Sequence, residues 1–280
     1  MTASAKLAPP VDRDISVNGL RIHYLDRGTH GKPPLLLLHG VGRSAHNFDH
    51  LAPHFVADYH VIAVDLRGHG DSDWHPEAAY LVEDYVTDIE ALVARLGLRD
   101  IVFWGNSTGG RVAQVFAGMH PDLTKAVIVE DVGPERPKEV SEGRAKRMAA
   151  EENGWASAEE LLAHIKPRYP LTPDATLENF VRHGSKRRED GRIVWKCDRA
   201  ITRGFVPTEL WRFIRNIKAP IIYVLGGASK IVPPQTQEEL KRTLPQVQIT
   251  SMPRLGHYPS DDRPAEFLAV VDGFLSAVSR

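Results

Sequence analysis

The segment GNSTGG, residues 105–110, matches the pattern G-x-S-x-G with Ser107 at its centre. It follows an apolar run and precedes a segment of helical character, so we predict a tight turn between a strand and a helix. Such a turn lifts a serine hydroxyl clear of the sheet, and the first N–H groups of the helix can stabilise an oxyanion. A plain glycine-rich turn is the alternative, but this one follows the third run of a predicted parallel sheet. We therefore predict Ser107 as a nucleophile.

A serine nucleophile needs a base, and the sequence contains 13 histidines. His257 differs from the others because its segment, RLGHYP, follows the last predicted strand and precedes the final helix. A loop in that position brings an imidazole over the strand ends, where it can accept the Ser107 proton. We expect Asp262, a few residues later, to be a helix N-cap.

The acid that should support this base is missing from its usual place, after the run IIYVLGG. No Asp or Glu occurs between Gly226 and Thr236, and Ser229 cannot neutralise an imidazolium. We expect Ser229 only to shape the loop beside His257.

The run KAVIVEDVGPE offers a substitute acid, because it ends in Glu130 and Asp131 beside the nucleophile strand. Neighbouring residues of a strand point to opposite faces, so at most one of the two should meet the histidine. The alternatives are that both are solvated at the strand end, or that one pairs with a nearby arginine.

An oxyanion also needs backbone donors from an earlier strand-to-helix loop. The segment LLLHGVGRS supplies such a loop. We predict that the N–H groups of Val41 and Thr108 form the oxyanion hole.

The elements that must position these residues follow from the alternation of apolar runs and amphipathic segments. A hairpin is predicted around Asn18-Gly19, and residues 80–98 show helical spacing. Most apolar runs lack polar alternation, which is typical of parallel strands covered on both faces. The predicted fold is therefore an α/β class fold with a mostly parallel, doubly covered sheet. The predicted strand runs cover residues 34–40, 59–68, 100–107, 125–131, 219–227 and 247–253.

The alternation of apolar, strand-like runs with helical segments stops between Gly133 and Pro207. This region shows helical candidates at 138–153, 157–166 and 173–185, then a polar turn and a lone β-like IVWK. We predict a helical cap at 133–207 over the strand ends, inserted into a core formed by 1–132 and 208–280. A lateral subdomain far from the chemistry is the alternative.

Composition limits the class of protein further. The 280 residues are 42% hydrophobic and 25% charged, with a net charge of −1 and one cysteine, Cys197. These values favour a soluble globular protein and give no support to nucleic-acid binding, membrane binding or disulfides. The first ten residues predict no signal peptide, so we expect a cytoplasmic protein. A homodimer is compatible with the sequence.

Four segments together resemble the α/β-hydrolase superfamily. HGVG, DLRGHGDSD, GNSTGG and GHYPSDDRPAEF occur in the order found in that superfamily, and the resemblance covers residues 15–278. It implies the α/β-hydrolase fold and matches His257 to the catalytic histidine. Residues 65–72 are mainly structural in this superfamily, so we assign them no catalysis.

The position of the acid in the sequence resembles that in one branch of the superfamily. Haloalkane dehalogenases and 2-(acetamidomethylene)succinate hydrolases include members with the acid after this strand, and EDVGP and SKIVPP resemble segments of the latter. The match puts the acid on Asp131, with Glu130 second.

The same resemblance extends into the cap and implies substrate-binding residues. It places Arg147 and Arg168 where arginines hold substrate carboxylates, although both could be exposed helix charges. Trp195 is either in the pocket or in a small cap core, and Tyr258 follows the histidine. The expected partner is thus a small-molecule, anionic substrate, without metal or organic cofactor.

The expected activity is serine hydrolysis of a small carboxylic ester, lactone or amide through an acyl-enzyme. Amide hydrolysis of a dicarboxylate and C–C bond hydrolysis of a meta-cleavage product are alternatives; the acid placement and Tyr258 count against the latter. Dehalogenation is excluded as a mechanism because its nucleophile is Asp. A ligand receptor without turnover is the alternative from another class.

Overall fold

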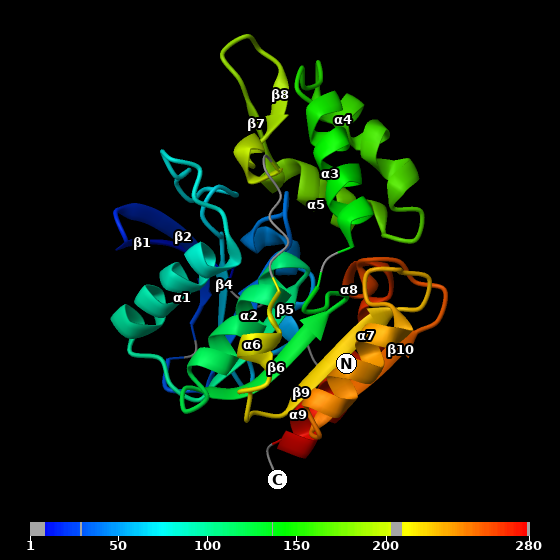
Figure 1. The fold of residues 1–280 in the computed structure, drawn as a ribbon. Helices are drawn as coiled ribbons and strands as arrows, with labels where there is room; N and C mark the ends of the chain where they lie inside the picture. The colour runs from blue at the N-terminus through cyan, green and yellow to red at the C-terminus, as the bar shows by residue number, and fades with distance from the viewer. Residues whose placement is uncertain (1–8, 29, 136, 203–208, 279–280) are drawn as a thin grey trace, which may run out of the picture.

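An eight-stranded sheet forms the centre of the fold (Figure 1). The computed structural model describes residues 9–28, 30–135, 137–202 and 209–278. The strand order is β1-β2-β4-β3-β5-β6-β9-β10, in which β2 runs antiparallel to β1 and β4 and the other neighbours are parallel. The predicted mostly parallel sheet is confirmed. Its strands are β1 (Val11–Val17), β2 (Leu20–Arg27), β3 (Pro34–Leu38), β4 (His60–Val64), β5 (Ile101–Asn106), β6 (Thr124–Glu130), β9 (Ile221–Gly226) and β10 (Val247–Met252).

Helices and short 3₁₀ turns connect these strands. Two predictions concern residues that lie outside the described ranges. These are the expected absence of a signal peptide, which involves residues 1–8, and the cap boundary at residue 207. None of the helices in the described ranges is both long and apolar enough to cross a membrane. The helical elements are η1 (Ala45–Phe48), η2 (Ala52–His54), α1 (Val82–Leu96), α2 (Thr108–Met119), α3 (Lys138–Ala150), α4 (Ala158–Ile165), η3 (Lys166–Arg168), α5 (Asp174–Gly184), η4 (Arg199–Thr202), α6 (Trp211–Ile214), α7 (Pro234–Thr243), α8 (Pro259–Asp262) and α9 (Pro264–Val278).

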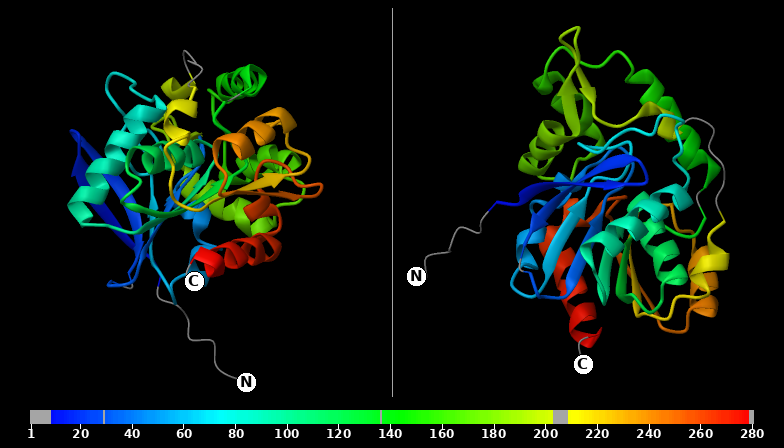
Figure 2. Two further views of the ribbon diagram at one scale, coloured as in Figure 1. Left: turned by 60° about the horizontal axis from the view of Figure 1, so that its bottom comes forward. Right: turned by 90° about the vertical axis from the view of Figure 1, so that its left-hand side faces the viewer.

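Each face of the sheet buries its own hydrophobic core, because successive side chains of a strand point to opposite faces. Leu36 and Phe103 belong to the core that contains side chains of α1, α2 and α7. Their neighbours Leu35 and Trp104 belong to the core beneath η1, η2 and α9. Figure 2 shows this layered arrangement. Burial on both faces explains why the strand runs are apolar throughout.

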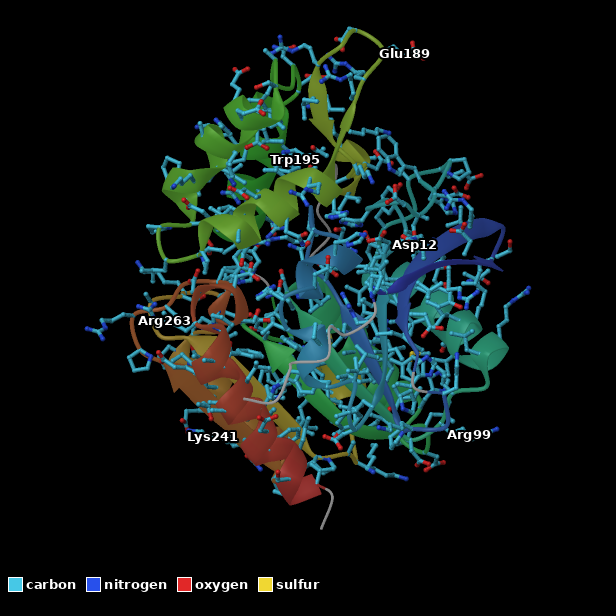
Figure 3. All side chains as sticks on the ribbon, turned by 180° about the vertical axis from the view of Figure 1, so that it is seen from behind. Asp12, Arg99, Glu189, Trp195, Lys241 and Arg263 are labelled. Carbon is cyan, nitrogen blue, oxygen red and sulfur yellow. The ribbon has the colours of Figure 1, made fainter. Side chains whose placement is uncertain are left out.

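The region between β6 and β9 forms a cap with its own small core. Trp155, Leu161, Phe180 and Ile193 are buried together there. The three predicted helices correspond to α3, α4 and α5. The β-like IVWK is not a lone strand: β7 (Ser185–Arg187) pairs antiparallel with β8 (Ile193–Trp195), across a turn whose tip carries Glu189 (Figure 3). The short, charged β7 gave no apolar signal to predict it from.

The cap lies over the end of the sheet at which β6 finishes (Figures 1 and 2). Hydrogen bonds between cap and core hold it in this position, and two of them show which parts of the core it meets. The Asn179 amide donates to the His46 carbonyl over 2.8 Å, and the Thr172 hydroxyl donates to the Asp262 carboxylate over 2.6 Å. The cap therefore contacts both the η1 loop and α8, the short helix that follows His257.

Candidate active site

The turn at Ser107 brings three segments of backbone into direct contact. Ser107 follows the last residue of β5 and precedes α2, with φ 50° and ψ −115°. Positive φ is uncommon and strained for a residue with a side chain. The surroundings enforce it: a β-carbon on Gly109 would overlap the Leu38 carbonyl, and one on Gly105 would overlap the backbone of Gly109. The two glycines let α2 pack directly on β3 and β5, as the sequence predicted for this turn.

The loop after β3 packs against the same turn. A β-carbon on Gly40 would lie 3.0 Å from Cβ of Ser107, and the Gly109 N–H donates to the His39 carbonyl over 3.1 Å. Val41, the next residue, is therefore close to Ser107 on one side. Thr108 is the first residue of α2, so its N–H has no partner in a preceding helical turn. The two predicted oxyanion donors lie on segments that flank the serine.

Asp131 directly follows β6, the strand next to that of Ser107. The pairing of Asn106 with Glu130 places Ser107 and Asp131 at adjacent strand ends. Oδ2 of Asp131 lies 2.8 Å from Nδ1 of His257, and the carboxylate is 1% exposed. The residue is held in this position with φ 45°. The structure therefore brings Asp131 and His257 together, as the sequence predicted.

Ser229 has a larger role than the predicted shaping of its loop. Its hydroxyl donates to Oδ2 of Asp131 over 2.6 Å, while the Gly226 N–H donates to Oδ1 over 3.0 Å. The Asp131 carboxylate thus accepts from a hydroxyl and an N–H in addition to the imidazole. The position left without an acid instead supplies a donor to the acid on the neighbouring strand.

His257 presents a free nitrogen to the site. Because Nδ1 donates to a carboxylate, Nε2 of the neutral ring is an acceptor. Nε2 is buried and has no hydrogen-bond partner among the described residues. Burial lowers the pKa of His257, with smaller contributions from the charges of Arg144 and Arg43, whereas Asp131 acts to raise it. The imidazole is therefore neutral near pH 7, the state that a general base requires.

Glu130, the alternative acid, faces a different set of partners. Its carboxyl oxygens accept hydrogen bonds from the Ser260 N–H over 3.0 Å and the Trp104 indole over 3.2 Å. Burial raises the pKa of Glu130 to about 7. Glu130 thus connects the nucleophile strand with α8 and makes no hydrogen bond to His257. Neighbouring strand residues point apart, which is why only one of the two carboxylates reaches the imidazole.

All four predicted substrate-binding residues line a cavity between cap and core. Arg168 in this cavity is paired with Glu151 over 2.7 Å, and Trp195 donates to the same carboxylate over 2.8 Å. Trp195 also stacks on Phe180, so it belongs to both the cavity wall and the cap core. The lining residues of the cavity include Val41, Arg43, Arg144, Arg147, Arg168, Tyr169, Trp195 and Tyr258.

Two arginines of this cavity were missed by the sequence reasoning. The guanidinium of Arg43 is buried, pairs with Asp261 over 2.9 Å and lies 4.0 Å from the Tyr258 ring centroid. Its Nη2 has no hydrogen-bond partner in the described part of the chain. Arg144 donates to the Val41 carbonyl over 3.1 Å. The sequence positions of both arginines could have pointed to the cavity. Arg43 follows HGVG, and Arg144 lies almost one helical turn before Arg147.

Other predictions are corrected or refined by the contacts. Asp262 is not an N-cap, because it is the last residue of α8 and its carboxylate accepts from Thr172. In residues 65–72, the Asp65 carboxylate binds His23 and the Ala45 N–H. These contacts join β2 to η1, away from Ser107.

Comparison with known proteins supports this fold. The Alpha/beta hydrolase family matches residues 35–270. The chain belongs to this family. The sn-1-specific diacylglycerol lipase of Mus musculus is 28% identical over 87% of this α/β hydrolase and 81% of its own length. An esterase of Mycobacterium tuberculosis is 28% identical over 87% of this chain and 83% of its own length.

A third relative shares the whole length of the chain. The 2-(acetamidomethylene)succinate hydrolase of Mesorhizobium japonicum is 25% identical over 95% of this α/β hydrolase and 96% of its own length. The crystal structure of an E-2-(acetamidomethylene)succinate hydrolase superposes with a TM-score of 0.87 at 25% identity, covering 95% of this chain and 99% of that one. These proteins are what this α/β hydrolase resembles, and their identities leave its substrate open.

Substitution of the two neighbouring acids should have unequal effects on turnover of a p-nitrophenyl ester. We expect Asp131→Asn to lower kcat by on the order of 10³–10⁴-fold, because the amide cannot stabilise an imidazolium and favours the wrong tautomer. The matched change Glu130→Gln should lower it by about tenfold or less, because it leaves the contact to His257 intact. Thermal unfolding of both variants checks that each is folded. The reverse ranking would show that Glu130 is the acid.

Proposed function

We propose that this α/β hydrolase is a serine hydrolase that cleaves a small carboxylic ester through an acyl-enzyme. One observation carries the proposal: Nδ1 of His257 is bound by Asp131, Nε2 has no hydrogen-bond partner among the described residues, and Ser107 follows the strand next to that of Asp131. This arrangement has the parts of a Ser-His-Asp relay. The names of the lipase and esterase relatives support an ester as the substrate.

The proposed mechanism follows from these parts. Ser107 Oγ attacks the ester carbonyl while His257 Nε2 accepts its proton, and Asp131 stabilises the imidazolium that forms. The N–H groups of Val41 and Thr108 hold the tetrahedral oxyanion. The intermediate collapses as His257 returns the proton to the leaving alcohol, which leaves an acyl group on Ser107. Water, deprotonated by His257, then releases the carboxylic acid and restores the serine.

The cavity charges favour a substrate that carries a carboxylate. Four arginines line it, against one acidic residue, Glu151, which is already paired with Arg168. Arg144 has no carboxylate within ion-pair distance among the described residues. A guanidinium with free donors in a partly buried site is suited to a carboxylate. We infer that Arg144 binds the anionic group together with Nη2 of Arg43, which has no hydrogen-bond partner among the described residues. Arg168, which is paired with Glu151, and Arg147, which is exposed, contribute less.

Amide hydrolysis is the second candidate activity. It is supported by the acid on Asp131 and by the similarity to a hydrolase whose named substrate combines an acetamido group with succinate, a dicarboxylate. The same relay of serine, histidine and aspartate would act on either bond.

Acyl-enzyme formation tests the proposed reaction. Wild-type protein mixed with a p-nitrophenyl ester should release p-nitrophenol in a burst of about one equivalent before the steady state, because acylation precedes hydrolysis. Ser107→Ala should show no burst. The exposed Ser276→Ala on α9 serves as the matched control and should retain it. A burst that survives in Ser107→Ala would refute the assignment, and the absence of any burst across a panel of esters would refute the esterase proposal.

The effect of replacing an arginine of the cavity on KM should depend on the charge of the substrate. We expect Arg144→Gln to raise KM for a half-ester of a dicarboxylic acid by about tenfold or more, because a charge-assisted hydrogen bond is lost. KM for the neutral diester should change by less than about twofold. Arg182→Gln, an exposed change on α5 outside the cavity, should affect neither substrate. An equal rise in KM for both esters would contradict the assignment of Arg144 to the anionic group.

A further inference from the structure

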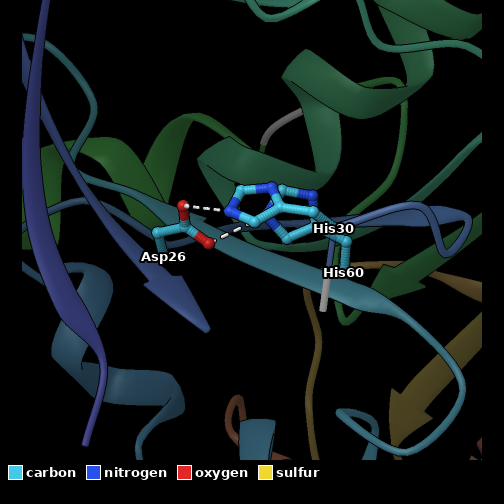
Figure 4. Close-up of side chains that lie close together, drawn as sticks. All are labelled: Asp26, His30 and His60. Carbon is cyan, nitrogen blue, oxygen red and sulfur yellow. Dashed lines mark hydrogen bonds and ion pairs between the residues drawn. The ribbon is translucent and has the colours of Figure 1, made fainter. Parts of the chain in front are cut away.

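We propose that Asp26, His30 and His60 form a binding site for a divalent transition-metal ion such as Zn²⁺ (Figure 4). One ligand atom from each of the three side chains lies within 4.8 Å of the others. The cluster lies near the amino end of β4, whereas Ser107 follows the carboxyl end of β5. It shares no residue with the cavity beneath the cap.

Strand pairing places two of the ligands on one face of the sheet. Asp26 on β2 is paired with Ile62 of β4, and His60 lies two residues earlier on the same strand. Residues two apart on a strand point to the same face, so both side chains emerge together. Oδ1 of Asp26 lies 2.8 Å from Nε2 of His60, and both side chains are nearly buried, at 10% and 12% exposure. Two rigid strands therefore hold two of the three ligands in place.

His30 reaches the same point from the loop between β2 and β3. Its Nε2 lies 4.0 Å from Oδ2 of Asp26, and its ring meets the His60 ring edge-on with centroids 4.7 Å apart. Gly28 makes this approach possible. A β-carbon on Gly28 would lie 3.1 Å from Nε2 of His30 and 3.2 Å from Oδ1 of Asp26, tighter than side chains normally approach. The glycine leaves space where a side chain would obstruct the ligand atoms.

The donor set and its spacing fit a transition metal. Zn²⁺ binds imidazole nitrogen and carboxylate oxygen at about 2.0–2.2 Å, which puts tetrahedral ligand atoms roughly 3.3 Å from one another. Nε2 of His60 lies 2.8 Å from Oδ1 of Asp26, and Nε2 of His30 lies 4.0 Å from Oδ2 of the same carboxylate. The first separation is about 0.5 Å shorter and the second about 0.7 Å longer than the tetrahedral value. A bound ion would replace the hydrogen bond between Asp26 and His60, and the His30 side chain, which is 75% exposed, is free to move toward the carboxylate. Water would take the fourth position.

Two other clusters have a similar composition but a different chemistry. In the cluster of His46, Asp49 and His183, the Asp49 carboxylate already pairs with Arg27 over 2.7 Å. In the cluster of His23, Asp65 and Asp71, Asp65 accepts backbone N–H groups. The contacts that the structure gives the Asp26 carboxylate are both to imidazoles.

Charged side chains around the cluster affect how strongly a metal ion can bind. Arg13, Lys32, Arg99 and Lys125 line the open cavity around the cluster, together with Asp14 and Asp100. The nearby cations oppose a metal ion, so the affinity must come from the ligands themselves. A bound ion would join β2, the following loop and β4, and would thereby stabilise the folded state.

Metal titration of the untagged, full-length protein tests the site. After chelator treatment and dialysis at pH 7.5, calorimetry should show one Zn²⁺ bound per chain, and a hundredfold excess over Kd should raise Tm by several degrees. His30→Gln should abolish both effects and leave the metal-free Tm unchanged, because that side chain is exposed. His183→Gln, from the second cluster, is the matched control and should retain both.

The same variants give a spectroscopic test. Co²⁺ added to the wild type should give the visible absorption bands of a low-coordinate site with nitrogen ligands, and these should be lost in His30→Gln and Asp26→Asn. The absence of binding in the wild type would overturn the proposal. So would binding that persists in His30→Gln or disappears in His183→Gln.

Discussion

The hydrogen bond between Asp131 and His257 is the interaction on which the site depends. It fixes the ring, selects the tautomer and leaves Nε2 free, and it does so from a strand that adjoins the nucleophile strand. The carboxylate is in turn held by Ser229 and the backbone of Gly226. A buried charge is tolerated only when it is paired and hydrogen-bonded, and Asp131 meets this condition with three donors. Ser229 thus belongs to the same machinery as the acid whose usual place it occupies.

The sheet supplies the rigidity that this small network needs. Gly105 and Gly109 allow β3, β5 and α2 to meet backbone to backbone, so Ser107 cannot relax from its positive φ without separating these elements. On the opposite side, Glu130 and Arg43 hold α8 through Ser260 and Asp261. The loop that carries His257 is therefore held at its α8 end. Preorganisation of this kind lets hydrogen-bond donors act on a developing charge without further rearrangement.

The sequence predicted the sheet and the helices between β6 and β9, because each of these depends on local pattern. The same patterns led to Ser107, His257 and Asp131, whose catalytic roles stay predictions. Apolar runs identify buried strands, and strand-end residues share one edge of a parallel sheet. The choice between Glu130 and Asp131 needed the side-chain directions or a resemblance. The ion pair of Arg43 with Asp261 and the hydrogen bond from Ser229 to Asp131 join segments far apart in the chain, so no local pattern shows these contacts. The strand β7 was missed because its residues are polar and only its partner has β-like character.

The cap sets the shape of the cavity in which we propose that the substrate binds. Its cavity combines residues from α3, η3, β8 and the core loops at Val41 and Tyr258, so its shape depends on how these separate pieces pack. We propose that Ser107 and its partners carry out the reaction and that the arginines select the molecule whose carbonyl is presented there. The two questions can be tested separately.

Covalent labelling by a fluorophosphonate, followed by peptide mass spectrometry, tests the central claim most directly. The reagent reacts with a serine only when a neighbouring base activates it and an oxyanion site receives the phosphoryl oxygen. The account predicts one label per chain, on the peptide that contains Ser107, with labelling strongly slowed when His257 is replaced by alanine. A label on any other residue, no label at all, or an unchanged rate in His257→Ala would contradict it.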